Sequence, residues 1–155
     1  MKKITNAFAL AMIVFCFGAA ASLAQGPKAA PAYKLSAVNI TPFNEASGKF
    51  EDVITPADTR SFFNDLSTSL FVTVEIQGEA GSYENGRKVQ VTVMEGKKVK
   101  FSKTEQVGLI GEGGKYFIPV WLYSAMCDEV KITAKLIGQK KISTITRKVT
   151  FECGE

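Results

Sequence analysis

The sequence predicts an all-β domain built as a two-sheet sandwich, and three observations carry this prediction. Short segments alternate between apolar and polar residues, as strands with one buried face do. Turn residues, many of them glycines, separate these segments. The chain has 155 residues, of which 46% are hydrophobic and 22% are charged, as in a single globular domain.

Seven segments show the alternating pattern, and we expect each to form one strand. The predicted strands are Tyr33 to Ile40, Ser69 to Gln77, Lys88 to Met94, Val99 to Val107, Tyr116 to Tyr123, Val130 to Ile137 and Ile142 to Glu152. Pro119 lies within one of them and has no amide hydrogen to donate. We therefore expect an edge position or a bulge at this proline.

The segment from Thr41 to Thr68 is too long for a simple connection between strands. Its sequence Thr55-Pro56-Ala57-Asp58 is typical of a helix start, with a capping threonine and a proline at the first helical position. The pattern predicts a short helix over Ala57 to Leu66. Such a helix would place Phe62 and Phe63 on one side.

The N-terminal residues have the anatomy of a bacterial secretory signal. Lys2 and Lys3 precede an unbroken apolar run, and Ser22-Leu23-Ala24 supplies small residues for cleavage after Ala24. The run is shorter than the ~20 residues that span a bilayer, although a retained anchor is the alternative. We expect a signal peptide over 1–24, a flexible tether over 25–32 and a sandwich over 33–155. The mature protein would be exported, periplasmic or extracellular, without a membrane span.

Two cysteines, Cys127 and Cys153, lie outside the predicted leader. An even number in an oxidising compartment favours a disulfide, with a structural role rather than a redox one. A turn at residues 138–141 would bring the two cysteines level across a hairpin. If Val149 and Phe151 face inward, however, regular pairing sets Cys153 opposite Met126 or Asp128 instead of Cys127. Cys127 must then lie in the corner before its strand, or the last strand must carry a bulge.

Composition and motifs argue against most catalytic chemistry. The 19 basic and 15 acidic residues give a net charge of only +4, which does not favour nucleic-acid binding. The chain has no histidine, the commonest general base. The acid pairs Glu51/Asp52 and Asp128/Glu129 are adjacent residues, so their side chains point apart in extended chain. We expect no catalytic residue, no cofactor and no metal site.

Three loops, at residues 78–88, 108–115 and 138–141, are predicted at one end of the sandwich. Loops at such an end often bind ligands, although ordinary solvated turns are the alternative. The candidate binding residues there are Glu79, Tyr83, Glu84, Asn85, Arg87, Glu112, Lys115, Gln139, Lys140 and Lys141.

An aromatic patch is predicted on the outer side of the Tyr116 to Tyr123 strand and of its neighbour. Its candidate members are Phe71, Phe117, Trp121 and Tyr123. An uncovered patch of this kind marks an interface. In the alternative, Phe62 and Phe63 of the long segment fold over it. Lysines also cluster around the turn at residues 95–97, where edge protection is a better explanation than a polyanion site.

The stretches SLFVTVEI, KVQVTVMEGKKVKF and EVKITAKLIG lie between Tyr33 and Cys153, and this region resembles the immunoglobulin-like sandwich, in particular its bacterial exported versions. The resemblance implies seven antiparallel strands, although Trp121 precedes both mature cysteines, unlike in antibody domains. Such folds host unrelated functions. We expect an exported, non-enzymatic binding or assembly module with a protein or envelope component as partner. The alternatives are a secreted hydrolase using carboxylate or lysine chemistry and a subunit of a surface filament.

Overall fold

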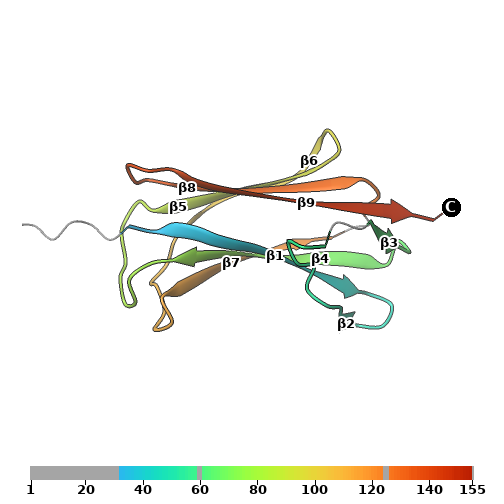
Figure 1. Ribbon diagram of the computed structural model, residues 1–155, viewed down its shortest axis with the longest axis horizontal. Helices are drawn as coiled ribbons and strands as arrows, with labels where there is room; N and C mark the ends of the chain where they lie inside the picture. The colour runs from blue at the N-terminus through green and yellow to red at the C-terminus, as the bar shows by residue number, and fades with distance from the viewer. Residues whose placement is uncertain (1–31, 59–60, 124–125, 155) are drawn as a thin grey trace, which may run out of the picture.

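The computed structural model describes residues 32–58, 61–123 and 126–154. The predicted signal peptide (1–24) and residues 25–31 of the predicted tether lie outside these ranges. The described residues form nine strands and no helix, as Figure 1 shows. The strands are β1 (Lys34–Asn44), β2 (Lys49–Phe50), β3 (Phe62–Asn64), β4 (Thr68–Gln77), β5 (Lys88–Glu95), β6 (Lys98–Gln106), β7 (Lys115–Leu122), β8 (Glu129–Ile137) and β9 (Ser143–Cys153).

The strands form two sheets that lie face to face, in the orders β2-β1-β4-β7 and β3-β9-β8-β5-β6 (Figure 1). The inward side chains of both sheets make one hydrophobic core. In β4 the alternate residues Leu70, Val72, Val74 and Ile76 are almost completely buried. Burial of each such side chain stabilises the fold by about 1.5–3 kcal/mol. The predicted all-β, sandwich-like architecture is therefore confirmed, but the described residues form nine strands instead of the seven expected, because the 41–68 segment adds β2 and β3.

Proline and lysine residues occupy the edges of the sheets, as the sequence predicts. β7 is an edge strand that pairs with β4 alone, and Pro119 lies opposite Thr73 in this pair. β6 is the edge strand of the other sheet, and its residues Lys98, Lys100 and Lys103 are exposed. Both features discourage the pairing of these edges with another strand.

The helix predicted over Ala57 to Leu66 is wrong for the residues that the structure describes. The proposed cap does form a turn, because the Asp58 carboxylate accepts hydrogen bonds from the Thr55 amide (2.7 Å) and hydroxyl (2.8 Å). The chain does not continue into a helix, however. Instead, Phe62–Asn64 form β3, which pairs in parallel with the end of β9.

Tertiary contacts explain why β3 forms in place of a helix. The Phe62 ring contacts the Phe151 ring of β9, with centroids 6.0 Å apart. The Asn64 side chain is buried and donates a hydrogen bond to the Met126 carbonyl (3.2 Å). Leu66 then takes a left-handed backbone conformation (φ 69°), which a helix does not allow. These contacts outweigh a helical signal limited to one turn.

The predicted disulfide joins Cys127 to Cys153, with the two Cα atoms 5.1 Å apart. β8 and β9 pair so that Glu129 faces Thr150. Cys127 lies in the corner just before β8, while Cys153 ends β9. The sequence analysis allowed either a corner position for Cys127 or a bulge in the last strand, and the structure has the corner position.

β1 and β9 run in the same direction, from one end of the molecule to the other (Figure 1). They belong to different sheets, but hydrogen bonds join them where both begin. The Leu35 amide donates to the Ser143 hydroxyl (3.3 Å), and the Tyr33 amide donates to the Gln139 side chain (3.2 Å). In the described ranges, no helix is long and apolar enough to cross a membrane.

Candidate binding surfaces

Five aromatic rings cluster on the outer face of the four-stranded sheet, and we call them the aromatic surface. Its members are Phe43, Phe50, Phe71, Trp121 and Tyr123. Trp121 lies at the centre, with its ring centroid 5.4–6.0 Å from those of the four other rings. The rings meet edge-on or tilted, and each such pair contributes about 0.5–1.5 kcal/mol beyond the area that it buries.

Strand register places three of the four predicted patch residues together. Phe71 of β4 lies directly opposite Trp121 of β7, and Tyr123 follows two residues later. Phe117 lies on the same outer face but opposite Glu75, about 13 Å from Trp121 along the strand. It is 49% exposed and lies outside the ring cluster.

The alternative in which Phe62 and Phe63 fold over the patch is wrong. Phe62 packs against Phe151 of the other sheet, and Phe63 is 72% exposed. A different part of the long segment covers the patch in part. Phe50 lies over it, because β2 pairs antiparallel with the end of β1 and sets Phe50 opposite Phe43.

A tight hairpin delivers Phe50 to this position. The Asn44 side chain accepts a hydrogen bond from the Ser47 amide (2.8 Å). Gly48 then adopts a φ of 66°, which glycine takes without strain. An asparagine followed four residues later by glycine, between two phenylalanines, is the hairpin signal that the sequence interpretation missed.

The aromatic surface is only half covered. Phe50 is 55% and Tyr123 74% exposed, while the other three rings are half-buried. The Trp121 indole N–H is buried and has no acceptor among the described residues. Exposed acids, Glu51 and Asp52, directly follow Phe50 and give this apolar area a polar rim.

A groove of about 380 Å³ continues the aromatic surface around the edge of β7 toward β6. It is lined by Lys100, Phe101, Trp121, Leu122, Tyr123 and Met126. The Lys100 ammonium pairs with Glu95 (2.6 Å). Burial alone would raise the pKa of Glu95, but hydrogen bonds from Lys100 and from the Cys127 amide hold this pKa below its ordinary value. Glu95 thus stays ionised and fixes Lys100 at the groove.

The three predicted loops do lie together at one end of the molecule. Between the first two loops, the Gly78 amide donates to the Gly114 carbonyl (3.0 Å), and the Gly81 amide donates to the Ile110 carbonyl (2.9 Å). The third loop joins them through a hydrogen bond from the Arg87 guanidinium to the Gly138 carbonyl.

Several of the candidate loop residues hold the structure together. Arg87 ties two loops, and the Gln139 amide donates to the Tyr33 and Lys141 carbonyls (2.8 Å each). Lys115 pairs with Glu75 (3.0 Å) on the outer face of the four-stranded sheet. The remaining candidates differ in how far they are exposed. The exposed ones are Glu79, Tyr83, Asn85, Glu112, Lys140 and Lys141, and Glu84 is partly buried.

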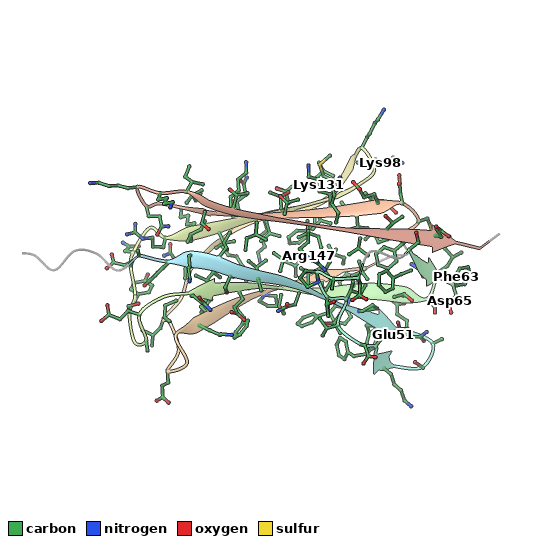
Figure 2. All side chains as sticks on the ribbon, in the orientation of Figure 1. Glu51, Phe63, Asp65, Lys98, Lys131 and Arg147 are labelled. Atoms are coloured by element: carbon green, nitrogen blue, oxygen red, sulfur yellow. A yellow bond between two sulfur atoms is a disulfide. The ribbon has the colours of Figure 1, made fainter. Side chains whose placement is uncertain are left out.

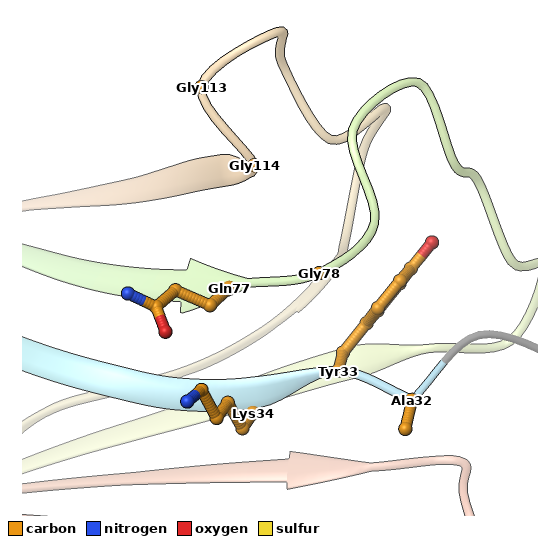
Figure 3. Close-up of a pocket in the computed structure, with 7 residues that line it drawn as sticks. All are labelled: Ala32, Tyr33, Lys34, Gln77, Gly78, Gly113 and Gly114. Atoms are coloured by element: carbon orange, nitrogen blue, oxygen red, sulfur yellow. The ribbon is translucent and has the colours of Figure 1, made fainter.

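A hollow of about 390 Å³ opens at this end, next to the start of β1 (Figure 3). Its lining residues are Ala32, Tyr33, Lys34, Gln77, Gly78, Gly113 and Gly114. Gly78 permits the close approach of Tyr33, since a Cβ at Gly78 would lie 2.6 Å from the tyrosine ring. The hollow offers a ligand one ammonium and one amide side chain, and we regard it as the weaker candidate.

The acid pairs Glu51/Asp52 and Asp128/Glu129 lie at the surface, exposed or half-buried. Glu51 and Asp52 are exposed, while Glu129 forms an ion pair with Lys148 (2.9 Å). Within the described part of the chain, no group of three or more histidine, cysteine or acidic residues could hold a metal ion.

In comparisons with known proteins, no family model matches the chain, and no curated protein matches it.

Proposed function

We propose that the protein is an exported, non-enzymatic binding or assembly module whose aromatic surface docks on a protein of the cell envelope. The aromatic surface is the observation that carries this proposal. The predicted signal peptide and the Cys127–Cys153 disulfide support export, because disulfides persist in oxidising compartments.

The strand order supports an immunoglobulin-like topology for this module. Without the short strands β2 and β3, three strands in the order β1-β4-β7 face four in the order β9-β8-β5-β6. Seven antiparallel strands divided between two facing sheets resemble the immunoglobulin-like sandwich. This fold is a common scaffold for recognition, but the function must be argued from the surface itself.

The geometry of the aromatic surface favours a protein partner. Neighbouring rings are inclined to each other by 49–82°, so the five rings do not share one flat face. Tryptophan, tyrosine and phenylalanine are enriched in protein interfaces, where apolar centres are surrounded by polar rims. Here Trp121 lies at the centre, and Glu51 and Asp52 lie near the edge.

Two double variants test the proposal by co-purification from the native envelope. F50S/Y123S removes the two most exposed rings, and L109S/I142S removes two equally exposed side chains (62% and 63%) from the loop end. We expect the first variant to lose a protein that the wild type and the second variant retain. Equal thermal stability of the three proteins is the control for folding.

The fluorescence of Trp121, the only tryptophan of the chain, provides a second measurement. Docking on the aromatic surface should shift its emission to shorter wavelength, because the partner excludes water. If F50S/Y123S retains every partner of the wild type, the proposal is wrong. Loss of the partner from L109S/I142S alone would assign docking to the loop end.

A further inference from the structure

The outer face of the five-stranded sheet carries a row of hydroxyl groups across four strands. Ser102 of β6 lies opposite Thr92 of β5, which lies opposite Thr133 of β8, which lies opposite Thr146 of β9. The Thr133 and Thr146 hydroxyls are 3.4 Å apart. Because neighbouring strands are about 4.8 Å apart, the row spans about 14 Å.

Two lysines flank this row on β8. Lys131 and Lys135 lie two residues before and after Thr133, so all three share the outer face and the lysine Cα atoms are about 13 Å apart. A shallow hollow of about 260 Å³ lies between them, lined by Gln90, Thr92, Met94, Lys131, Thr133 and Lys135. Figure 2 shows Lys131 on the outer side of the upper sheet.

The described residues leave two lysines of this face without an opposite charge. Lys131 lies directly opposite Lys148, and like charges in this position destabilise a sheet. The nearby acid, Glu129, pairs with Lys148 (2.9 Å). Among the described residues, neither Lys131 nor Lys135 has an ion-pair partner. An anionic ligand beside Lys131 and Lys135 would supply the opposite charge that the described residues do not provide.

We propose that this face binds an acidic polysaccharide. We call it the threonine–lysine face, composed of Gln90, Thr92, Ser102, Lys131, Thr133, Lys135 and Thr146. Its two ammonium groups would pair with carboxylates along the polymer. The hydroxyl row and the Gln90 amide, which both donate and accept hydrogen bonds, would bind the sugar hydroxyls.

The same face is less suited to other polyanions. None of its residues is aromatic, whereas binding of single-stranded nucleic acid depends on stacking of bases on aromatic rings. A flat sheet face also presents no element that enters a duplex groove. Met94 is the only apolar side chain in the hollow, so insertion into a lipid surface has little support. The threonine–lysine face and the aromatic surface lie on opposite sheets, so this inference stands apart from the proposed function.

Binding to immobilised polygalacturonate, a polymer of uronic acid, tests the inference with the folded, full mature chain. We expect the wild type to bind, and K131Q/K135Q to bind about five- to tenfold more weakly. The matched control K34Q/K49Q removes the same charge from exposed lysines of the other sheet and should bind as the wild type does. T92V/T133V keeps all charges, so it should bind more weakly with an unchanged dependence on salt.

Four outcomes would overturn the inference. They are no binding of polygalacturonate by the wild type, equal losses in the two lysine variants, unchanged binding by T92V/T133V, and tighter binding of duplex DNA or of phosphatidylglycerol vesicles than of polygalacturonate. Neutral dextran should not bind. Circular dichroism of each variant separates loss of the ligand from loss of the fold.

Discussion

Removal of the Cys127–Cys153 disulfide should destabilise the protein strongly without changing its fold. In C127S/C153S, serine replaces two cysteines that are exposed or half-buried, so the substitution itself leaves no cavity in the core. The bridge joins residues 26 positions apart. In the chain-entropy treatment, a closed loop of this size lowers the entropy of the unfolded chain enough to contribute about 3.5 kcal/mol. For a domain of this size, the loss corresponds to a decrease of roughly 10–15 °C in Tm.

Urea unfolding followed by Trp121 fluorescence measures this effect. The double variant should unfold at a lower urea concentration, and wild-type protein treated with a reductant should match it. A loss below about 1 kcal/mol would refute the entropic account, because two ordinary surface substitutions can together cost that much. A difference between the reduced wild type and the double variant would show that the serines themselves perturb the structure.

Two further substitutions test the account of the fold. G138A should lower the free energy of unfolding by at least about 2 kcal/mol, because Gly138 has a φ of 87° and its added methyl would collide with the Gly86 carbonyl. The control in the same thermal melts is G113A, whose added methyl meets no atom within 4 Å. A hydrogen bond from the Ser36 hydroxyl lowers the pKa of Glu75 and outweighs its burial. The ionised carboxylate therefore stabilises the fold above its ordinary pKa, and this contribution disappears as the pH falls through the lower pKa of the folded state. Urea midpoints at about pH 7 and about pH 3 should differ more for the wild type than for E75Q, and equal differences would contradict the account.

The long strands could be predicted because they depend on local, periodic signals, and the disulfide because two cysteines lie outside the predicted leader. In β4, alternate apolar residues determine which face is buried, and a slip of one residue would reverse it. The same parity argument, applied to Val149 and Phe151, left two solutions, and the structure has the one with Cys127 in the corner before β8. The order and direction of the strands also determine which loops lie at the same end, so the meeting of the three loops could be predicted as well.

The aromatic surface could be predicted only in part, because it is completed by a segment with weak local signals. β2 has two residues, too few for any periodic pattern, yet it sets Phe50 beside Phe43 and Trp121. Sequence analysis also assigned the turn at Thr55 to a helix, because a capping motif looks alike in a helix and in an isolated turn. Which phenylalanine covers Trp121 depends on tertiary contacts that no pattern within the segment encodes.

The opposite placement of the two ends of the described chain has a mechanical consequence. The start of β1 and the end of β9 lie at opposite ends of the molecule, and both strands run between these ends (Figure 1). A pulling force on the two ends would therefore act along the strands, so the hydrogen bonds that join β1 to β4 would bear the load together rather than open one by one. After these bonds rupture, the Cys127–Cys153 disulfide would still prevent the 26-residue stretch between the two cysteines from extending. This stretch corresponds to roughly 90 Å of fully extended chain. A domain with this geometry is suited to carry tension between two attachment points.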